Sequence, residues 1–205
     1  MIKNEISDQK KKLRERIWKL LEEKGVARFP LPLKDRIPNF EGSDKAAELV
    51  ITLPEWKKAK IVFSNPDFAQ QKVRELVLKE GKILIMATPR LKEGYLKIDP
   101  KNVKGIGEKA STIAGAFKCG EKIKDLPKPD LIITGCVAVD ENGWRLGKGG
   151  GYGDKEITRL TKEFGKIPVI TTVHDLQIID KVPHGDFDTK VDYIITPNKI
   201  IKCFL

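Results

Sequence analysis

The segment with the clearest chemical potential is rich in glycine and runs from Arg145 to Asp154 with the letters RLGKGGGYGD. Five of the seven residues 147–153 are glycine. Residues without a Cβ atom expose backbone N–H groups that can surround a phosphate, above all where a helix follows directly. The letters after the loop predict such a helix over 154–160. The segment therefore predicts phosphate binding, and an exposed loop without a ligand is the alternative.

Charged residues within this segment extend the same interpretation. Arg145 and Lys148 would add positive charge beside a phosphate, and Asp154 lies close to the expected helix start. An aspartate there can cap the helix or hold a divalent cation. The loop is not a Walker A motif, because it lacks the Gly-Lys-Ser/Thr ending, and it does not match the dinucleotide-binding fingerprint.

Further polar residues follow short apolar runs, where ligands of open α/β sheets bind. Asn65-Pro66-Asp67 and Thr88-Pro89-Arg90 each follow one such run. His174 and Asp175 end another, and they open a C-terminal region that also holds the following residues: Asp180, His184, Asp186, Asp188 and Asp192. Loop aspartates more often act as caps and turn formers, which remains the alternative for each of them.

Five short apolar runs indicate the elements that would position these residues. They are 60–64, 82–87, 130–134, 168–173 and 192–196. Helix-like stretches separate several of them, and such alternation predicts an α/β fold with a mostly parallel sheet and helices on both faces. The length of 205 residues is compatible with one domain over 1–205.

The N-terminal part predicts helices and one connector. Ser7 and Asp8 are suitable N-caps for a helix with apolar residues at 13, 17, 20 and 21, which would end at Gly25. Lys10 and Arg14 lie four residues apart and share a face of it, where they could meet one anionic group or face solvent. Three prolines favour an irregular, semi-extended connector over 29–39, and short helices are expected over 43–50 and from Pro54.

Composition narrows the class of protein. The net charge of +10 favours an anionic partner, but the lysines are spread along the chain instead of forming a stripe, so RNA binding is the less favoured option. Three cysteines without metal-ligand spacing, Cys119, Cys136 and Cys203, predict a reducing, cytoplasmic location. The apolar runs are too short to span a bilayer. We expect a monomer or a weak homodimer.

Several of these segments together resemble the 5-formyltetrahydrofolate cyclo-ligase (methenyltetrahydrofolate synthetase) family. They are an N-terminal Lys-x-x-Leu-Arg helix, the loop RLGKGGGYGD, and a closing part with Gln177, Pro183, Asp188 and Asp192-x-x-x-Thr196-Pro197. The segments FPLPLKDRIPNFEG, ATPRLKEG and VHDLQIID are most similar to the subgroup of methenyltetrahydrofolate synthetase domain-containing proteins.

The resemblance implies a three-layer α/β fold like that of ribose-5-phosphate isomerase and the CoA transferases. It also implies a reaction that needs ATP and Mg²⁺ and converts 5-formyltetrahydrofolate to 5,10-methenyltetrahydrofolate. Arg145 and Lys148 would be catalytic, and Asp154 and Asp192 would hold the metal. Asp67, Tyr152, His174 and Gln177 would bind the substrate. The implied ATP-binding residues are Lys10, Arg14, Arg145, Leu146, Gly147, Lys148, Gly149, Gly150, Gly151, Tyr152 and Gly153.

Departures from the family pattern concentrate on the folate side. Asp67 replaces the usual glutamate, Gly153 replaces the second tyrosine of Tyr-Tyr-Asp-Arg, and Lys155 replaces its arginine. Two alternatives therefore stay open. One is a related reduced pterin as the substrate, and the other is a catalytically diverged module that binds a nucleotide or RNA.

Overall fold

The computed structural model describes residues 2–203, with side chains from residue 5 onward. The helices are α1 (Ile2–Glu23), α2 (Ser43–Val50), α3 (Pro54–Lys58), α4 (Gln71–Lys79), α5 (Gly107–Ala110), α6 (Ile113–Cys119) and α7 (Tyr152–Phe164). The large sheet contains β3 (Ile61–Ser64), β4 (Ile83–Ala87), β5 (Tyr95–Ile98), β6 (Glu121–Ile123), β7 (Leu131–Thr134), β10 (Val169–Thr172), β11 (Tyr193–Ile195) and β12 (Ile200–Lys202). Two small ribbons pair β1 (Ala27–Arg28) with β2 (Asn39–Phe40) and β8 (Ala138–Val139) with β9 (Arg145–Leu146).

The large sheet has the order β12-β11-β10-β7-β3-β4-β5-β6. Its central strands β11, β10, β7, β3 and β4 are parallel, and they are the five apolar runs that the sequence predicts as strands. Both faces of a parallel sheet are covered, so its strands are mainly apolar. The antiparallel strands β5 and β6 at one end of the sheet and β12 at the other make the sheet mixed. The predicted α/β fold with a mostly parallel sheet is confirmed.

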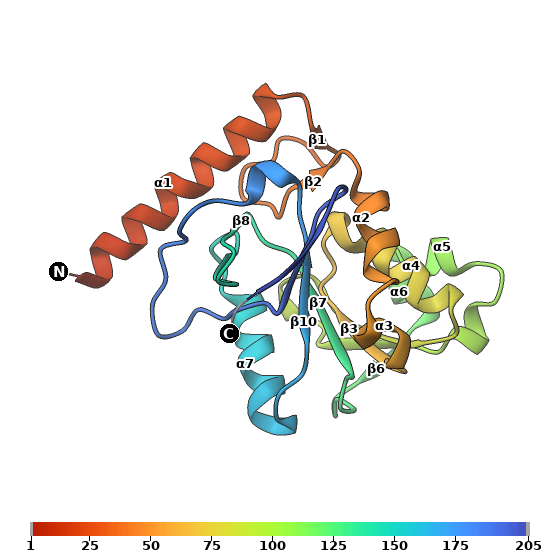
Figure 1. The fold of residues 1–205 in the computed structure, drawn as a ribbon. Coiled ribbons are helices and arrows are strands. Elements are labelled where there is room, and N and C mark those ends of the chain that lie inside the picture. Colours follow the sequence, from red (N-terminus) through yellow and green to blue (C-terminus); the bar gives the residue numbers. More distant parts are fainter. Residues whose placement is uncertain (1, 204–205) are drawn as a thin grey trace.

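Helices cover both faces of this sheet, which gives three layers (Figure 1). On one face, α2 to α6 pack on alternate strand residues such as Val62, Leu84 and Ile133, around the fully buried Trp56. On the other face, Ile157 and Leu160 of α7 pack against the strand residues that alternate with these, such as Phe63 and Ile132. The two-residue period of the strands thus divides one apolar run between two cores.

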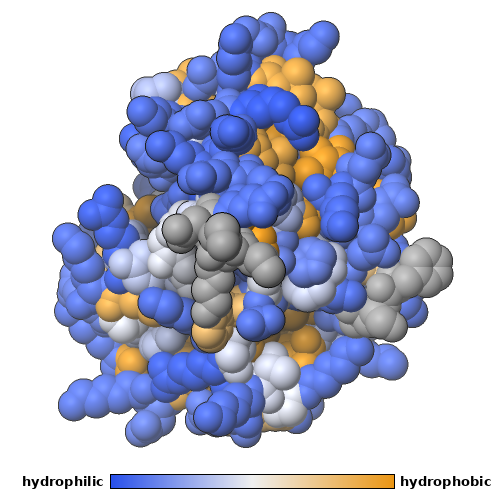
Figure 2. Space-filling model, turned by 90° about the vertical axis from the view of Figure 1, so that its left-hand side faces the viewer, coloured by the Kyte–Doolittle hydropathy of each residue, from blue (hydrophilic) through white to orange (hydrophobic). Residues whose placement is uncertain are grey.

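Helix α1 lies across the side of the molecule that carries β8 and β9 (Figure 1). Leu13, Ile17 and Leu21 bury their side chains there with residues of the connector and of β8. The helix begins at Ile2, so the prediction that Ser7 and Asp8 cap its start is wrong: the chain already has helical conformation before them. The face of the molecule shown in Figure 2 is mainly hydrophilic, with a hydrophobic area in its upper part.

Other predicted elements agree with the structure. Helix α2 spans residues 43–50, α3 begins at Pro54, and the connector between β1 and β2 contains turns and bends only. The three cysteines are free thiols. Among the described residues, no helix is both long enough and apolar enough to cross a bilayer.

Candidate active site

A cavity of about 250 Å³ lies at the carboxyl edge of the sheet, where β3, β4 and β7 end. Three segments supply most of its lining: 65–68 after β3, 87–91 after β4, and the glycine-rich loop with the start of α7, 147–154. Arg36 and Ile37 of the connector close it on another side. The cavity therefore unites the glycine loop with both Asn-Pro-Asp and Thr-Pro-Arg, as the position of ligand sites in α/β sheets leads one to expect.

The glycine-rich loop leaves β9 and leads directly into α7. Gly149 has a φ of 113° and Gly151, the N-cap of α7, has a φ of 68°, so both adopt backbone conformations that other residues rarely accept. Arg14 Nε donates a hydrogen bond of 2.7 Å to the carbonyl oxygen of Gly147. Helix α1 thus contacts the loop through Arg14, so two of the segments expected in one ATP site lie next to each other.

Lys10, one turn before Arg14, holds a second loop in place. Its Nζ lies 2.6 and 2.5 Å from the two carboxylate oxygens of Asp188. Asp188 in turn accepts a hydrogen bond from the backbone N–H of Gly185. Lys10 therefore approaches the site from the side of the 185–189 loop and does not line the cavity.

Arg145 is buried behind the glycine loop, with 2% of its side chain exposed. Its Nη2 donates to Asp154 Oδ1 at 2.9 Å, and the same oxygen accepts bonds from the backbone N–H and the hydroxyl of Thr189. A Cβ atom at residue 153 would lie 2.7 Å from Nη2 of Arg145, so Gly153 makes room for this guanidinium. A side chain at residue 153 would therefore require this guanidinium to shift.

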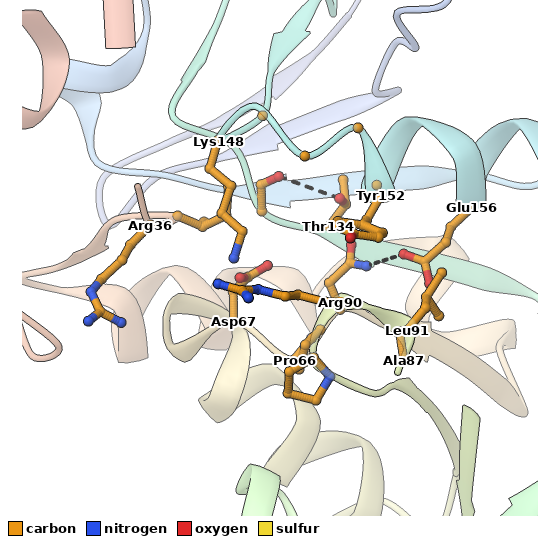
Figure 3. Close-up of a pocket in the computed structure, with 18 of the residues that line it drawn as sticks. Arg36, Pro66, Asp67, Ala87, Arg90, Leu91, Thr134, Lys148, Tyr152 and Glu156 are labelled. Atoms are coloured by element: carbon orange, nitrogen blue, oxygen red, sulfur yellow. Dashed lines mark hydrogen bonds between the residues drawn. The ribbon is translucent and has the colours of Figure 1, made fainter. Parts of the chain in front are cut away.

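Asp67 and Lys148 face each other inside the cavity (Figure 3). Burial raises the pKa of Asp67, and the positive charges of Lys148, Arg74 and Arg145 oppose this shift. The buried Arg74 also donates hydrogen bonds of 2.8 Å to the backbone oxygens of Asn65 and Asp67. These bonds fix the turn that carries the side chains of Asn65 and Asp67. Burial lowers the pKa of Arg74 to about 10, so it stays charged at neutral pH.

Three of the residues expected to bind the substrate or the metal, His174, Gln177 and Asp192, do not line the cavity. Gln177 is fully buried, and it donates to the backbone oxygens of Cys136 and Val137 and accepts from His174 N. His174 caps the 3₁₀ turn Asp175–Gln177 with its Nδ1. Neither lines the cavity, because both side chains are used to hold this turn against the strand below it.

Asp192 is also remote from the cavity. It precedes β11, and its carboxylate accepts a hydrogen bond from the backbone N–H of Val169 at the start of β10. It therefore lies at the amino edge of the parallel strands, whereas Asp154 belongs to the group at the carboxyl edge. The structure does not bring the expected metal pair together, and no cluster of three or more potential metal ligands occurs in the part of the chain that the structure describes.

Glu156 is a cavity residue that the motif-based analysis did not select. It lies on α7 with 3% exposure, and its Oε2 accepts a hydrogen bond of 2.6 Å from Asn65 Nδ2 (Figure 3). The signal was present in the sequence, because residues 153, 156, 157 and 160 share one helix face and this face also carries Ile157 and Leu160. A glutamate on the apolar face of a helix indicates a buried carboxyl group.

Burial raises the pKa of Glu156 from 4.5 to about 7, although the hydrogen bond from Asn65 opposes the shift. The folded state thus favours the neutral carboxyl group, and this contribution to stability is lost as the pH rises through 7. The unfolding free energy of Glu156→Gln minus that of the wild type should therefore be about 2 kcal/mol larger at pH 8 than at pH 5. Urea unfolding of both proteins at the two pH values measures this difference. An unchanged difference would mean that Glu156 titrates normally.

The mostly parallel sheet, with a glycine-rich loop and a cavity lined by charged residues at its carboxyl edge, defines an α/β protein with a candidate ligand site at that edge. Within this class, the sequence pattern of the 5-formyltetrahydrofolate cyclo-ligase family matches residues 6–197. The chain belongs to this family.

Individual relatives agree with the assignment. The methenyltetrahydrofolate synthase domain-containing protein of Mus musculus is 40% identical over 204 residues, which cover 94% of this chain and 54% of that protein. The 5-formyltetrahydrofolate cyclo-ligase of Escherichia coli (strain K12) is 35% identical over 75 residues, 37% of this chain and 40% of that protein. The chain spans about half the length of the domain-containing proteins that it matches.

A solved structure supports the fold along almost the whole chain. The NMR structure of Aquifex aeolicus 5,10-methenyltetrahydrofolate synthetase is 25% identical, with a TM-score of 0.59, and the match covers 98% of this chain and 93% of that one. The resemblance to the cyclo-ligase family that the sequence motifs indicate is thereby confirmed.

Proposed function

We propose that this chain uses ATP to convert 5-formyltetrahydrofolate, or a related reduced pterin, to the 5,10-methenyl form, with release of ADP and phosphate. The observation that carries the proposal is the glycine loop at the N-terminus of α7, which opens into the same cavity as Lys148, Arg145 and three carboxyl groups. Backbone N–H groups and cations suit a triphosphate, and carboxyl groups suit the N–H donors of a pterin.

The reaction requires the protein to position the formyl group against ATP and to neutralise the charge of the transferred phosphoryl group. The formyl oxygen would attack the γ-phosphorus of ATP, and the bond from phosphorus to the ADP oxygen would break. The neighbouring nitrogen of the folate would then attack the formyl carbon and lose its proton, and the carbon–oxygen bond to phosphate would break. Lys148, whose exposed side chain reaches into the cavity, would neutralise the transferred phosphoryl group, while Arg145 would act from behind the loop.

The residues that would bind ATP surround the loop on two sides. Arg14 holds the loop backbone through Gly147 O, and the backbone from 147 to 153 would face the phosphates. Lys10 would contribute through the 185–189 loop, since its ammonium group is bound to Asp188. Asp67 and Tyr152, which line the cavity, would contact the substrate.

A magnesium ion fits this site as a companion of ATP. Mg²⁺ binds proteins through one or two carboxylates and otherwise through substrate phosphates and water. Asp154 is the carboxylate beside the glycine loop, and its Oδ1 is used by Arg145 and Thr189, so its other oxygen would bind the metal. When bound, the ion would offset the charge of the phosphates.

The reaction itself provides the test. Purified protein incubated with 5-formyltetrahydrofolate, ATP and Mg²⁺ should develop the absorbance band of the methenyl product, and release of ADP should match it in amount. Omission of ATP or of Mg²⁺ should abolish the signal. Absence of product with all three present would contradict the proposed activity, and ADP release without the band would point to another acceptor.

A further inference from the structure

Three carboxyl groups line the cavity, and one of them, Asp154, is bonded to Arg145 and Thr189. The surroundings of the other two, Asp67 and Glu156, differ (Figure 3). Asp67 lies among positive charges, because Lys148, Arg74 and Arg145 all act on it and Arg90 points into the same space. Glu156 lies at the other end of the cavity, toward Ala87 and Leu91. At Asp67, a neutral ring with N–H donors would compete with these cations for the carboxylate. At Glu156 it would meet no such competition.

Glu156 is bonded through only one of its oxygens. Asn65 donates to Oε2, whereas Oε1 is buried and has no hydrogen-bond partner among the described residues. The charged groups that act on Glu156 are Asp67, Arg145 and Arg159, and Tyr95 is a further titratable neighbour. Neither arginine forms an ion pair with the Glu156 carboxylate within 4.0 Å. A buried oxygen without a partner is costly unless a ligand supplies the missing bond.

The missing partner of Oε1 has a defined chemical character. Because Asn65 fixes Oε2 as an acceptor, an ionised Glu156 offers Oε1 as a second acceptor on the same carboxylate. Two neighbouring N–H groups on the edge of a flat heterocycle can bond to both oxygens of such a group, and the ring would lie against the apolar side chains beside it. The amino-lactam edge of a reduced pterin has this arrangement of donors.

We propose that Glu156, held by Asn65, binds the N–H edge of the pterin ring, and that Asp67 is not the principal carboxylate for this edge. This inference rests on the proposed function, because that function supplies the pterin. It also explains how the chain can recognise a pterin although Asp67 is shorter than the glutamate of the family pattern. Asp67 would instead place a negative charge opposite Lys148, without an ion pair between the two side chains among the described residues.

The test compares isosteric variants of the two carboxyl groups. The dissociation constant of 5-formyltetrahydrofolate is measured by calorimetry at pH 8 for the wild type, Glu156→Gln and Asp67→Asn. Glu163→Gln, an exposed change on the same helix, is the control. Loss of a hydrogen bond to a charged group weakens binding by about 10- to 100-fold, so we expect this loss for Glu156→Gln, a smaller loss for Asp67→Asn, and less than about 3-fold for Glu163→Gln.

The pH dependence separates recognition from a merely structural role. Ionised Glu156 accepts the N–H bonds, so the wild-type affinity should rise between pH 6 and pH 8, while that of Glu156→Gln should stay flat. A loss confined to Asp67→Asn, or equal for both variants, overturns the inference and leaves the proposed function intact. If the wild type binds no 5-formyltetrahydrofolate, the proposed function falls, and this inference falls with it.

Discussion

Lys148→Ala is expected to reduce turnover of 5-formyltetrahydrofolate by about 10²- to 10³-fold, which is the usual effect of removing one group that stabilises transition-state charge. The side chain is exposed, and no hydrogen bond or ion pair holds it among the described residues. Its ammonium group therefore stays available for a phosphoryl group, and its loss leaves the packing of the protein unchanged. Steady-state kinetics and a thermal melt measure the two effects.

Lys162→Ala is the matched control for this variant, because Lys162 is exposed on the last turn of α7 and does not line the cavity. It should keep both turnover and melting temperature. A shift of several degrees in the melting temperature of Lys148→Ala would assign the lysine to the fold. Unchanged turnover with an unchanged melting temperature would remove Lys148 from the mechanism.

The central sheet could be predicted because the environment of each strand leaves a simple pattern. A parallel strand buried on both faces is mainly apolar, as in residues 83–87 and 131–133, and turns or helices bound it on both sides. Edge strands leave no such pattern. Glu121–Ile123 is polar and largely exposed, and it becomes a strand only because β5 offers it a free edge.

The site could be predicted where one residue type has few other uses. The glycines of residues 147–153 indicate a loop that approaches a ligand, and the structure places this loop on the cavity. Aspartate and glutamine have many uses, and here Gln177 and His174 stabilise a turn. For Asp192 the sequence did contain the deciding signal: it precedes its apolar run, whereas Asn65 and Gly135 follow theirs, and in a parallel sheet this places it at the opposite edge.

The packing of α7 explains why the contacts of Glu156 and of Arg145 could not be predicted from the sequence. A sequence shows that residue 156 shares a face with Ile157, but not that Asn65, distant in the chain, meets it there. In the same way, Gly153 appears in the sequence as one more loop glycine. Only the approach of Arg145 to the first turn of the helix shows that a side chain at this position would require the guanidinium to shift.

Asp154→Ala is expected to lower the unfolding free energy by about 3 kcal/mol, because removal of one partner of a buried ion pair leaves the other charge uncompensated. Arg145 has 2% exposure and Asp154 has 16%. The variant also removes the acceptor of both bonds from Thr189 and so loosens the 185–189 loop, which Lys10 holds through Asp188. Urea unfolding at pH 7 measures the loss.

The double variant Arg145→Met, Asp154→Ala distinguishes an uncompensated charge from lost packing. Methionine fills much of the volume of arginine without a charge, so the double variant should be more stable than Asp154→Ala alone. If the two single changes instead add, the pair contributes no coupling, and the cost of Asp154→Ala comes from its bonds to Thr189. In that case Thr189→Val should reproduce part of the loss, since it removes the hydroxyl that donates to Asp154 Oδ1 at 2.8 Å and leaves the backbone N–H bond in place.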